Sequence, residues 1–156
     1  MDSKFIAHVE ELKPQLERLL GMRPVTSTTL PSVMPRKGVY VLSDGDKHLY
    51  VGRSNDIKGR IDRHSLPSAS HNKATFAFRL AREATGHLKP TYKKGDGSRE
   101  ALMKDTKFVA AFTAAKERIR KMNLRFVEET DPVRQALLEI YVAVVLETPY
   151  NDFDNH

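Results

Sequence analysis

Two short segments of this chain each hold a tyrosine beside a valine and a glycine. They are Gly38-Val39-Tyr40 and, ten residues on, Tyr50-Val51-Gly52. Arg60 and His64 follow at a spacing of four, which places both side chains on one face of a helix. Phenol, guanidinium and imidazole groups that lie close together suit catalysis at a phosphodiester and are poor choices for filling a core. The spacing therefore predicts a site for phosphate-ester chemistry.

A β-hairpin and a following helix are expected to position these groups. Residues 38–42 and 48–52 have the composition of β-strands, and the Asp44-Gly45 pair between them is a strong hairpin signal. Ser54 or Asn55 is expected to cap the next helix. The two tyrosines then lie on paired strands, and the arginine and histidine lie on the helix after them.

The other elements follow from apolar periodicity and from helix-breaking residues. An amphipathic helix is expected over residues 5–20, either kinked at Pro14 or starting afresh there, with Gly21 as its end. An extended connector over residues 22–36 leads to the hairpin. Further along we expect a helix over 74–85, a loop over 86–98, a long helix over 99–122, a strand over 123–128, and a helix from Asp131-Pro132 to Pro149.

Composition bounds the class of protein. The 156 residues are 40% hydrophobic, enough for a folded core, and Lys and Arg exceed Asp and Glu by six. This balance fits a polyanionic partner, although a basic protein without one has the same composition. Cysteine is absent, which excludes disulfides and thiolate metal sites and is compatible with a reducing cytoplasm. The charged N-terminal stretch predicts neither a signal peptide nor a membrane helix, so we expect a cytoplasmic protein.

Other common catalytic patterns are missing from the sequence. The remaining histidines have no partners at the spacing of zinc ligands. No glycine-rich loop carries a Walker lysine, and no serine stands in a nucleophile elbow. The tyrosine, arginine and histidine set is left as the candidate site.

The chain resembles the GIY-YIG nucleases at six positions in the expected order. The two tyrosine segments match the two halves of the motif that names the family, each with valine in place of isoleucine. Arg53-Ser54-Asn55 stands where the family has a polar turn. The other matches are Arg60, His64, Glu139 and the terminal Pro149-Tyr150-Asn151, whose asparagine lies twelve residues after the glutamate. The resemblance covers about residues 37–64 and 124–151.

The resemblance implies an α/β (α+β) fold, with a small, mainly antiparallel three-stranded sheet flanked by helices. Residues 1–36 are expected to form an N-terminal helix and connector. Residues 37–156 are expected to form the nuclease domain, with a helical insertion at about 65–122. The resemblance does not account for the N-terminal region or the insertion.

A metal-dependent endonuclease acting on DNA is the activity that the resemblance implies. Glu139 would hold one Mg²⁺ (or Mn²⁺), since a single carboxylate with waters is typical of magnesium. Arg60 would neutralise charge on the scissile phosphate. Tyr40 would be the general base, although deprotonating an ordinary tyrosine at pH 7 costs about 4 kcal/mol. The alternative for Glu139 is a place on an exposed strip of its helix.

Three further roles come from the same resemblance. His64 would take the proton from Tyr40 or bind the phosphate, and Tyr50 would orient water or phosphate. Asn151 would buttress the site or contact a phosphate oxygen. The ordinary alternatives are strand aromatics with wet hydroxyls, a surface histidine and a C-terminal turn residue.

Basic side chains outside the motif are expected to contact nucleic acid. They are Arg53, Lys73, Lys93, Lys94 and Arg99, although such a group is often only a solvated face. A catalytically silent nucleic-acid-binding module of the same fold stays open, as does a structure-selective or RNA-directed nuclease. One active site cuts one strand, so a homodimer or a targeting partner protein also stays open.

Overall fold

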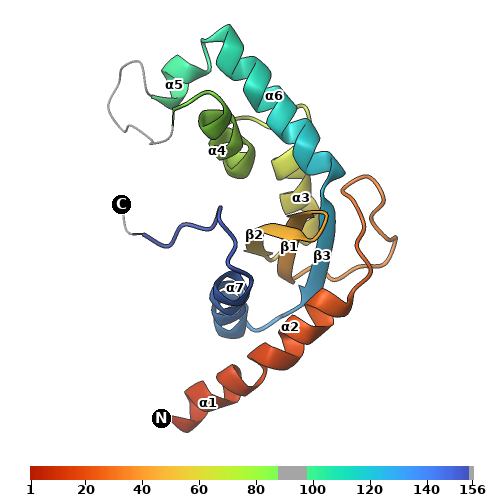
Figure 1. Ribbon diagram of the computed structural model, residues 1–156. Helices are drawn as coiled ribbons and strands as arrows, with labels where there is room; N and C mark the ends of the chain where they lie inside the picture. The colour runs from red at the N-terminus through yellow and green to blue at the C-terminus, as the bar shows by residue number, and fades with distance from the viewer. Residues whose placement is uncertain (88–97, 155–156) are drawn as a thin grey trace. The chain divides into compact units, whose positions relative to one another are not determined.

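The computed structural model describes residues 1–87 and 98–154 (Figure 1). The chain divides into two compact units. The first unit comprises residues 1–60 and 122–156, and the second comprises residues 61–121.

A three-stranded antiparallel sheet forms the centre of the first unit, as the sequence predicts. Strands β1 (Gly38–Asp44), β2 (Lys47–Ser54) and β3 (Asn123–Glu128) lie in the order β2-β1-β3, so β2 is an edge strand. The β1–β2 hairpin turns at Gly45, whose φ of 58° explains why glycine stands there. The predicted fold class and the predicted strand over 123–128 are confirmed.

Two helices form the N-terminal part of the chain, and the second of them packs on the sheet. Helix α1 (Ser3–Glu10) ends just before α2 (Leu12–Gly21), so the N-terminal helix starts afresh and is not merely kinked. Pro14 lies in the first turn of α2, where backbone N–H groups have no partner within the helix. Gly21 ends α2, as predicted.

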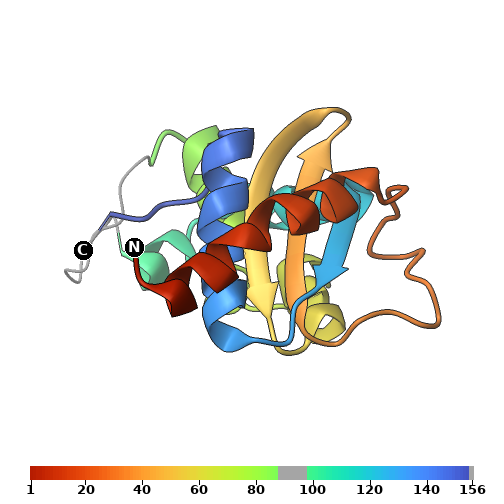
Figure 2. The ribbon, with the colours of Figure 1, turned by 90° about the horizontal axis from the view of Figure 1, so that it is seen from below.

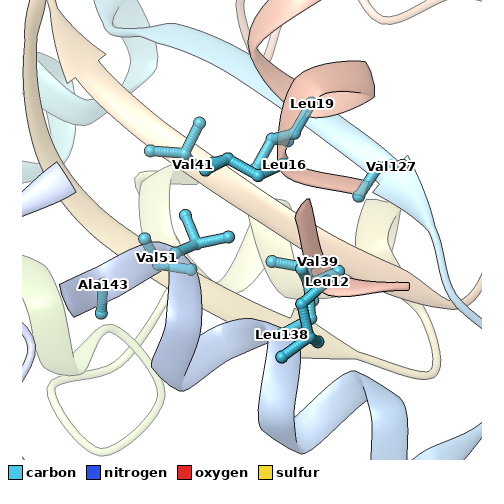
Figure 3. Packing of buried hydrophobic residues seen from close by; sticks show 10 residues of the cluster. Leu12, Leu16, Leu19, Val39, Val41, Val51, Val127, Leu138 and Ala143 are labelled. Atoms are coloured by element: carbon cyan, nitrogen blue, oxygen red, sulfur yellow. The ribbon is translucent and has the colours of Figure 1, made fainter. Parts of the chain in front are cut away.

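One face of the sheet packs against α2 and α7 (Pro132–Leu146), as Figures 2 and 3 show. Asp131 caps α7 by accepting a hydrogen bond from the backbone N–H of Arg134 at 2.8 Å, which confirms the predicted helix start. The helix ends at Leu146, three residues before Pro149. The buried side chains on this face are Leu12, Leu16, Leu19, Val39, Val41, Val51, Val127, Leu138, Val142 and Ala143.

Helix α3 (Ile57–Ser65) begins in the first unit and continues into the second. Its cap differs from the prediction: Asp56 accepts a hydrogen bond from the backbone N–H of Gly59 at 3.2 Å. The predicted cap Ser54 instead accepts from the backbone N–H of Asp56 at 2.9 Å. Capping therefore falls two residues later than Ser54, at the residue directly before the helix.

The second unit is helical, and α4 (Thr75–Ala84) packs against α6 (Thr106–Lys121) (Figure 1). The single helix predicted over 99–122 is wrong, because α5 (Arg99–Leu102) is a separate short helix. Residues 103–105 separate α5 from α6, and the side chain of Asp105 accepts a hydrogen bond from the backbone N–H of Lys107 at 2.9 Å. Within the two described ranges, no helix is long and apolar enough to cross a membrane.

Candidate active site

Tyr40 and Gly52 are direct partners on the neighbouring strands β1 and β2. The Tyr40 side chain is fully buried, and its phenol ring occupies the space above Gly52. A Cβ built on Gly52 would overlap the Oη, Cζ and Cε1 atoms of that ring. The glycine of the second tyrosine segment is thus required by the tyrosine of the first.

Arg60 joins the two tyrosines. The rings of Tyr40 and Tyr50 lie 6.4 Å apart between centroids, tilted by 45°. The Arg60 side chain is hydrogen-bonded to both phenols. The first turn of α3 therefore places a guanidinium at the sheet face that carries both hydroxyls.

Both phenols are held in the neutral form. Burial raises the pKa of Tyr40 well above its ordinary value of 10.0, and the nearby Tyr50 raises it further. Burial also raises the pKa of Tyr50, and Arg60 lowers both values by a smaller amount. The direction of the Tyr40 shift opposes the predicted role as a general base, because deprotonation now costs more than for an ordinary tyrosine.

These groups open into a pocket of about 450 Å³ at the edge of β2. Its lining is almost wholly polar, with no cluster of apolar side chains. The residues that line it are Tyr40, Tyr50, Gly52, Arg53, Ser54, Asn55, Arg60, Gln135 and Glu139. Five of the predicted site residues thus meet in one cavity, namely Tyr40, Tyr50, Arg53, Arg60 and Glu139.

Glu139 projects from α7 into this pocket with 24% of its side chain exposed. The Nε atom of Arg53 lies 3.7 Å from the Oε1 atom of Glu139. Burial raises the pKa of the Glu139 carboxyl above its ordinary 4.5, and Arg53 offsets part of that shift through its charge and its backbone N–H. The exposed-strip alternative does not describe this carboxylate, which is half-buried in the pocket that Tyr40 and Tyr50 also line.

Gln135 is a pocket residue that the sequence pattern did not reveal. It lies one turn before Glu139 on α7 and is 2% exposed. Its Nε2 donates to the carbonyl of Glu129 at 3.1 Å and to that of Ser54 at 3.4 Å, and lies 3.5 Å from Oδ1 of Asn55. Gln135 therefore holds the turn after β2. Its spacing of four from Glu139 was the one available signal.

Asn151 binds the free edge of β2. Its Nδ2 donates to the carbonyl of Val51 at 2.7 Å, and its Oδ1 accepts from the backbone N–H of Val51 at 2.8 Å. The same oxygen accepts from the Thr148 hydroxyl at 2.7 Å. Both ends of the amide are engaged with the protein, which favours the buttressing role over contact with a phosphate oxygen.

The other predicted residues are not in this pocket lining. His64 lies in the second unit, fully buried, with its ring edge-on to Phe76 at 6.2 Å between centroids. Arg99 donates to the carbonyl of His71 at 3.1 Å within that unit, where Lys73 is exposed. Lys93 and Lys94 lie outside the described residues.

The residues present fit a single magnesium-type cation. Mg²⁺ is commonly bound by one or two carboxylates with waters completing its shell, and Glu139 with the open pocket meets that need. A cation would also relieve the burial that raises the pKa of Glu139. Among the described residues, no three His, Cys, Asp or Glu side chains cluster as a wholly protein-made site would require.

A family model described as the GIY-YIG catalytic domain matches residues 36–151. Neither the comparison with curated proteins nor that with solved structures found a match. The matched segment contains both tyrosine strands, Arg60, Glu139 and Asn151, and it covers well over half of the chain. The chain therefore belongs to the GIY-YIG family, and its catalytic domain is a nuclease domain of the kind that hydrolyses phosphodiester bonds.

Proposed function

We propose that the protein is a metal-dependent endonuclease that cuts DNA in the pocket between β2, α3 and α7. One observation carries this proposal. A single cavity contains two neutral phenols hydrogen-bonded to one guanidinium, with a half-buried carboxylate beside them. Phosphodiester hydrolysis needs a positioned water and positive charge on the non-bridging oxygens, and this pocket offers groups for both.

Arg60 is the phosphate-binding group in this scheme. Its forked donors match two oxygens of a phosphate, and its hydrogen bonds to the phenols fix its orientation before substrate arrives. Its positive charge then lies where negative charge grows in the transition state. Fixed charge of this kind contributes most when no reorganisation is needed.

Tyr40 and Tyr50 act as neutral hydrogen-bonding groups. Their raised pKa values keep both hydroxyls protonated at neutral pH, so each can donate to a phosphate oxygen or hold a water. Tyr40 is buried and rigid, which suits it to orient the attacking water. Proton removal by Tyr40 itself would need far more stabilisation of the phenolate than Arg60 provides.

Glu139 would hold the divalent cation, in exchange for its ion pair with Arg53. When bound, that cation supplies positive charge to the phosphate and lowers the pKa of nearby water. Arg53, 45% exposed, is then free to contact the nucleic-acid backbone at the pocket mouth. His64 has no part in this scheme, because its buried ring packs against Phe76 and, unlike Tyr40, does not line the pocket.

Cleavage of supercoiled plasmid tests the proposal. Wild-type protein with Mg²⁺ or Mn²⁺ is expected to produce nicked circles first, because one active site cuts one strand. EDTA should abolish the reaction, and Glu139→Gln should lower its rate by about two orders of magnitude or more. Glu17→Gln, at an exposed position of α2, is the matched control and should cut like wild type.

Full metal-dependent cleavage by Glu139→Gln would show that the pocket is not the active site. Arg60→Lys gives a second check, because lysine keeps the charge and loses the forked donors. We expect it to bind DNA with little change and to cut it much more slowly. A variant as active as wild type would remove Arg60 from the mechanism.

A further inference from the structure

Positive charge is divided very unevenly between the two units. Residues 61–121 hold 14 of the 26 Lys and Arg but 6 of the 20 Asp and Glu, a net charge of +8. The remainder of the chain, which contains the catalytic pocket, has a net charge of −2. The surplus that suggests a polyanionic partner thus belongs wholly to the second unit.

This division has a direct consequence for binding. Affinity for a nucleic acid comes largely from cations that replace counterions on its phosphates. The catalytic unit offers no such surplus, and its pocket pairs one of its two arginines with Glu139. We therefore expect most of the electrostatic affinity for nucleic acid to come from residues 61–121.

Some cations of the second unit serve its own fold. The Nζ atom of Lys116 donates to the carbonyls of Pro67 and Ala69 at 2.7 and 3.0 Å, and the Nε atom of Arg82 donates to the carbonyl of His87 at 2.9 Å. Both side chains are buried. The described cations with exposed side chains are Arg63, Lys73, Arg79, Arg99, Lys104, Lys107, Arg118 and Lys121.

Three of these exposed cations share one strip of α6. At 100° per residue, Lys107, Arg118 and Lys121 fall within about 60° of one another around the helix axis. The exposed Ala110 and Ala114 lie between Lys107 and Arg118 along the axis, and all five residues fall within about 80°. We name these five residues the α6 strip. Glu117 lies beside the α6 strip, with its Oε1 atom 3.9 Å from the Nζ atom of Lys121. This is an exposed ion pair, and such pairs contribute little to stability.

The dimensions of the strip match a DNA groove. Lys107 and Arg118 are eleven residues apart, or about 16 Å along the helix axis. The alanines between them allow close approach, and an α-helix fits the B-DNA major groove, which is about 12 Å wide. The cations at both ends then reach phosphates on either side. The deep, narrow major groove of duplex RNA does not admit a helix in this way.

We propose that the second unit is the DNA-binding part of the protein and that the α6 strip docks duplex DNA through its phosphates. This inference rests on the proposed nuclease function, and it names a surface of the second unit that binds the substrate. The catalytic unit contributes chemistry, and the second unit contributes affinity.

Binding of a 25-base-pair duplex by full-length Glu139→Gln protein tests this, with fluorescence anisotropy in EDTA across a salt series. Changing Lys107, Arg118 and Lys121 together to alanine should weaken binding at least about tenfold and lower the salt slope by about 2 to 3. The matched control changes Lys4, Lys13 and Lys47, exposed cations of the first unit, and should leave the slope nearly unchanged. Thermal unfolding confirms that both variants are folded.

Equal losses of DNA affinity in the strip variant and the control variant would overturn the proposal, because the net charge of the protein alone would then explain binding. An RNA duplex bound as tightly as DNA of the same length would overturn the choice of DNA. The nuclease function fails independently: strip-dependent DNA binding by a protein that never cuts would keep the binding surface and refute the active site. In the cutting enzyme, the strip variant should raise KM and preserve kcat at saturating DNA.

Discussion

Gly52→Ala tests the central contact of the pocket with one methyl group. The added Cβ overlaps the phenol of Tyr40, whose side chain is fully buried and cannot swing into solvent. Either the ring moves or the β1–β2 pairing opens at this point. Both outcomes disturb the hydroxyl that Arg60 holds.

The size of the effect follows from the overlap. Forcing a methyl group into a packed site usually costs about 1–3 kcal/mol, so we expect a loss near 2 kcal/mol in the free energy of unfolding. For a chain of this length, that corresponds to about 4–8 °C in Tm. Displacing a catalytic group by about 1 Å can cost about 100-fold in rate, so kcat should fall more than stability suggests.

Thermal unfolding and plasmid nicking together measure both effects. Gly21→Ala is the matched control, because a Cβ there meets nothing within 4 Å. The sharper test repeats Gly52→Ala in a Tyr40→Leu background, which removes the overlapped atoms. There the alanine should cost less than about 0.5 kcal/mol. An equal cost in both backgrounds would show that the phenol is not what Gly52 accommodates.

Two further predictions concern stability. Asn151→Ala should lower the free energy of unfolding by about 2 kcal/mol, because the N–H and the carbonyl of Val51 both lose their hydrogen-bond partners. Urea denaturation measures this loss, and Asn72→Ala, at an exposed position, should show no comparable loss. Burial, and then the charge of Arg125, lowers the pKa of His48 below its ordinary 6.5. As the pH drops through 6.5, the His48 ring therefore binds a proton in the unfolded chain before it does so in the folded protein. The free energy of unfolding falls over this range as a result. His48→Gln should flatten the pH dependence of the unfolding free energy between pH 7.5 and 5.5 by about a few tenths of a kcal/mol, because His48 is only partly buried. An unchanged slope would contradict this.

Local signals predicted the elements that depend on local chemistry. The Asp44-Gly45 turn and the Asp131-Pro132 helix start both appear where the sequence places them. The break at 103–105 was missed because residues 99–122 keep a helical apolar pattern across it. At the start of α6, the side chain of Asp105 accepts a hydrogen bond from the backbone N–H of Lys107, which favours a new helix there.

The meeting of four motif residues in one pocket was predictable from the sequence, but several of their contacts were not. The motif predicts that Tyr40, Tyr50, Arg60 and Glu139 act together, and one pocket holds all four. It does not predict that Arg60 bonds both phenols, or that burial raises the pKa of Tyr40. Those properties depend on how much water the assembled fold leaves around each group, which no spacing in the chain encodes.

The free edge of β2 explains the positions of Tyr150, Asn151 and Glu139. An edge strand leaves alternate N–H and C=O groups unpaired, and a partly buried edge must satisfy them. The backbone of Tyr150 bonds the carbonyl of Leu49, and the Asn151 amide bonds both groups of Val51. The next outward N–H along the strand, that of Arg53, bonds the Glu139 carboxylate.

Glu139 and Asn151 therefore continue the β-ladder with side chains where a fourth strand would otherwise pair. The asparagine cannot leave without exposing Val51, whereas the glutamate has one replaceable partner, the half-exposed Arg53. In the proposed function, a cation would replace only the Arg53 side chain at the Glu139 carboxylate. Asn151 would stay bound to the strand edge, because its amide is held by both backbone groups of Val51. This difference in partners suits Asn151 to a buttressing role and Glu139 to the proposed role of ligand.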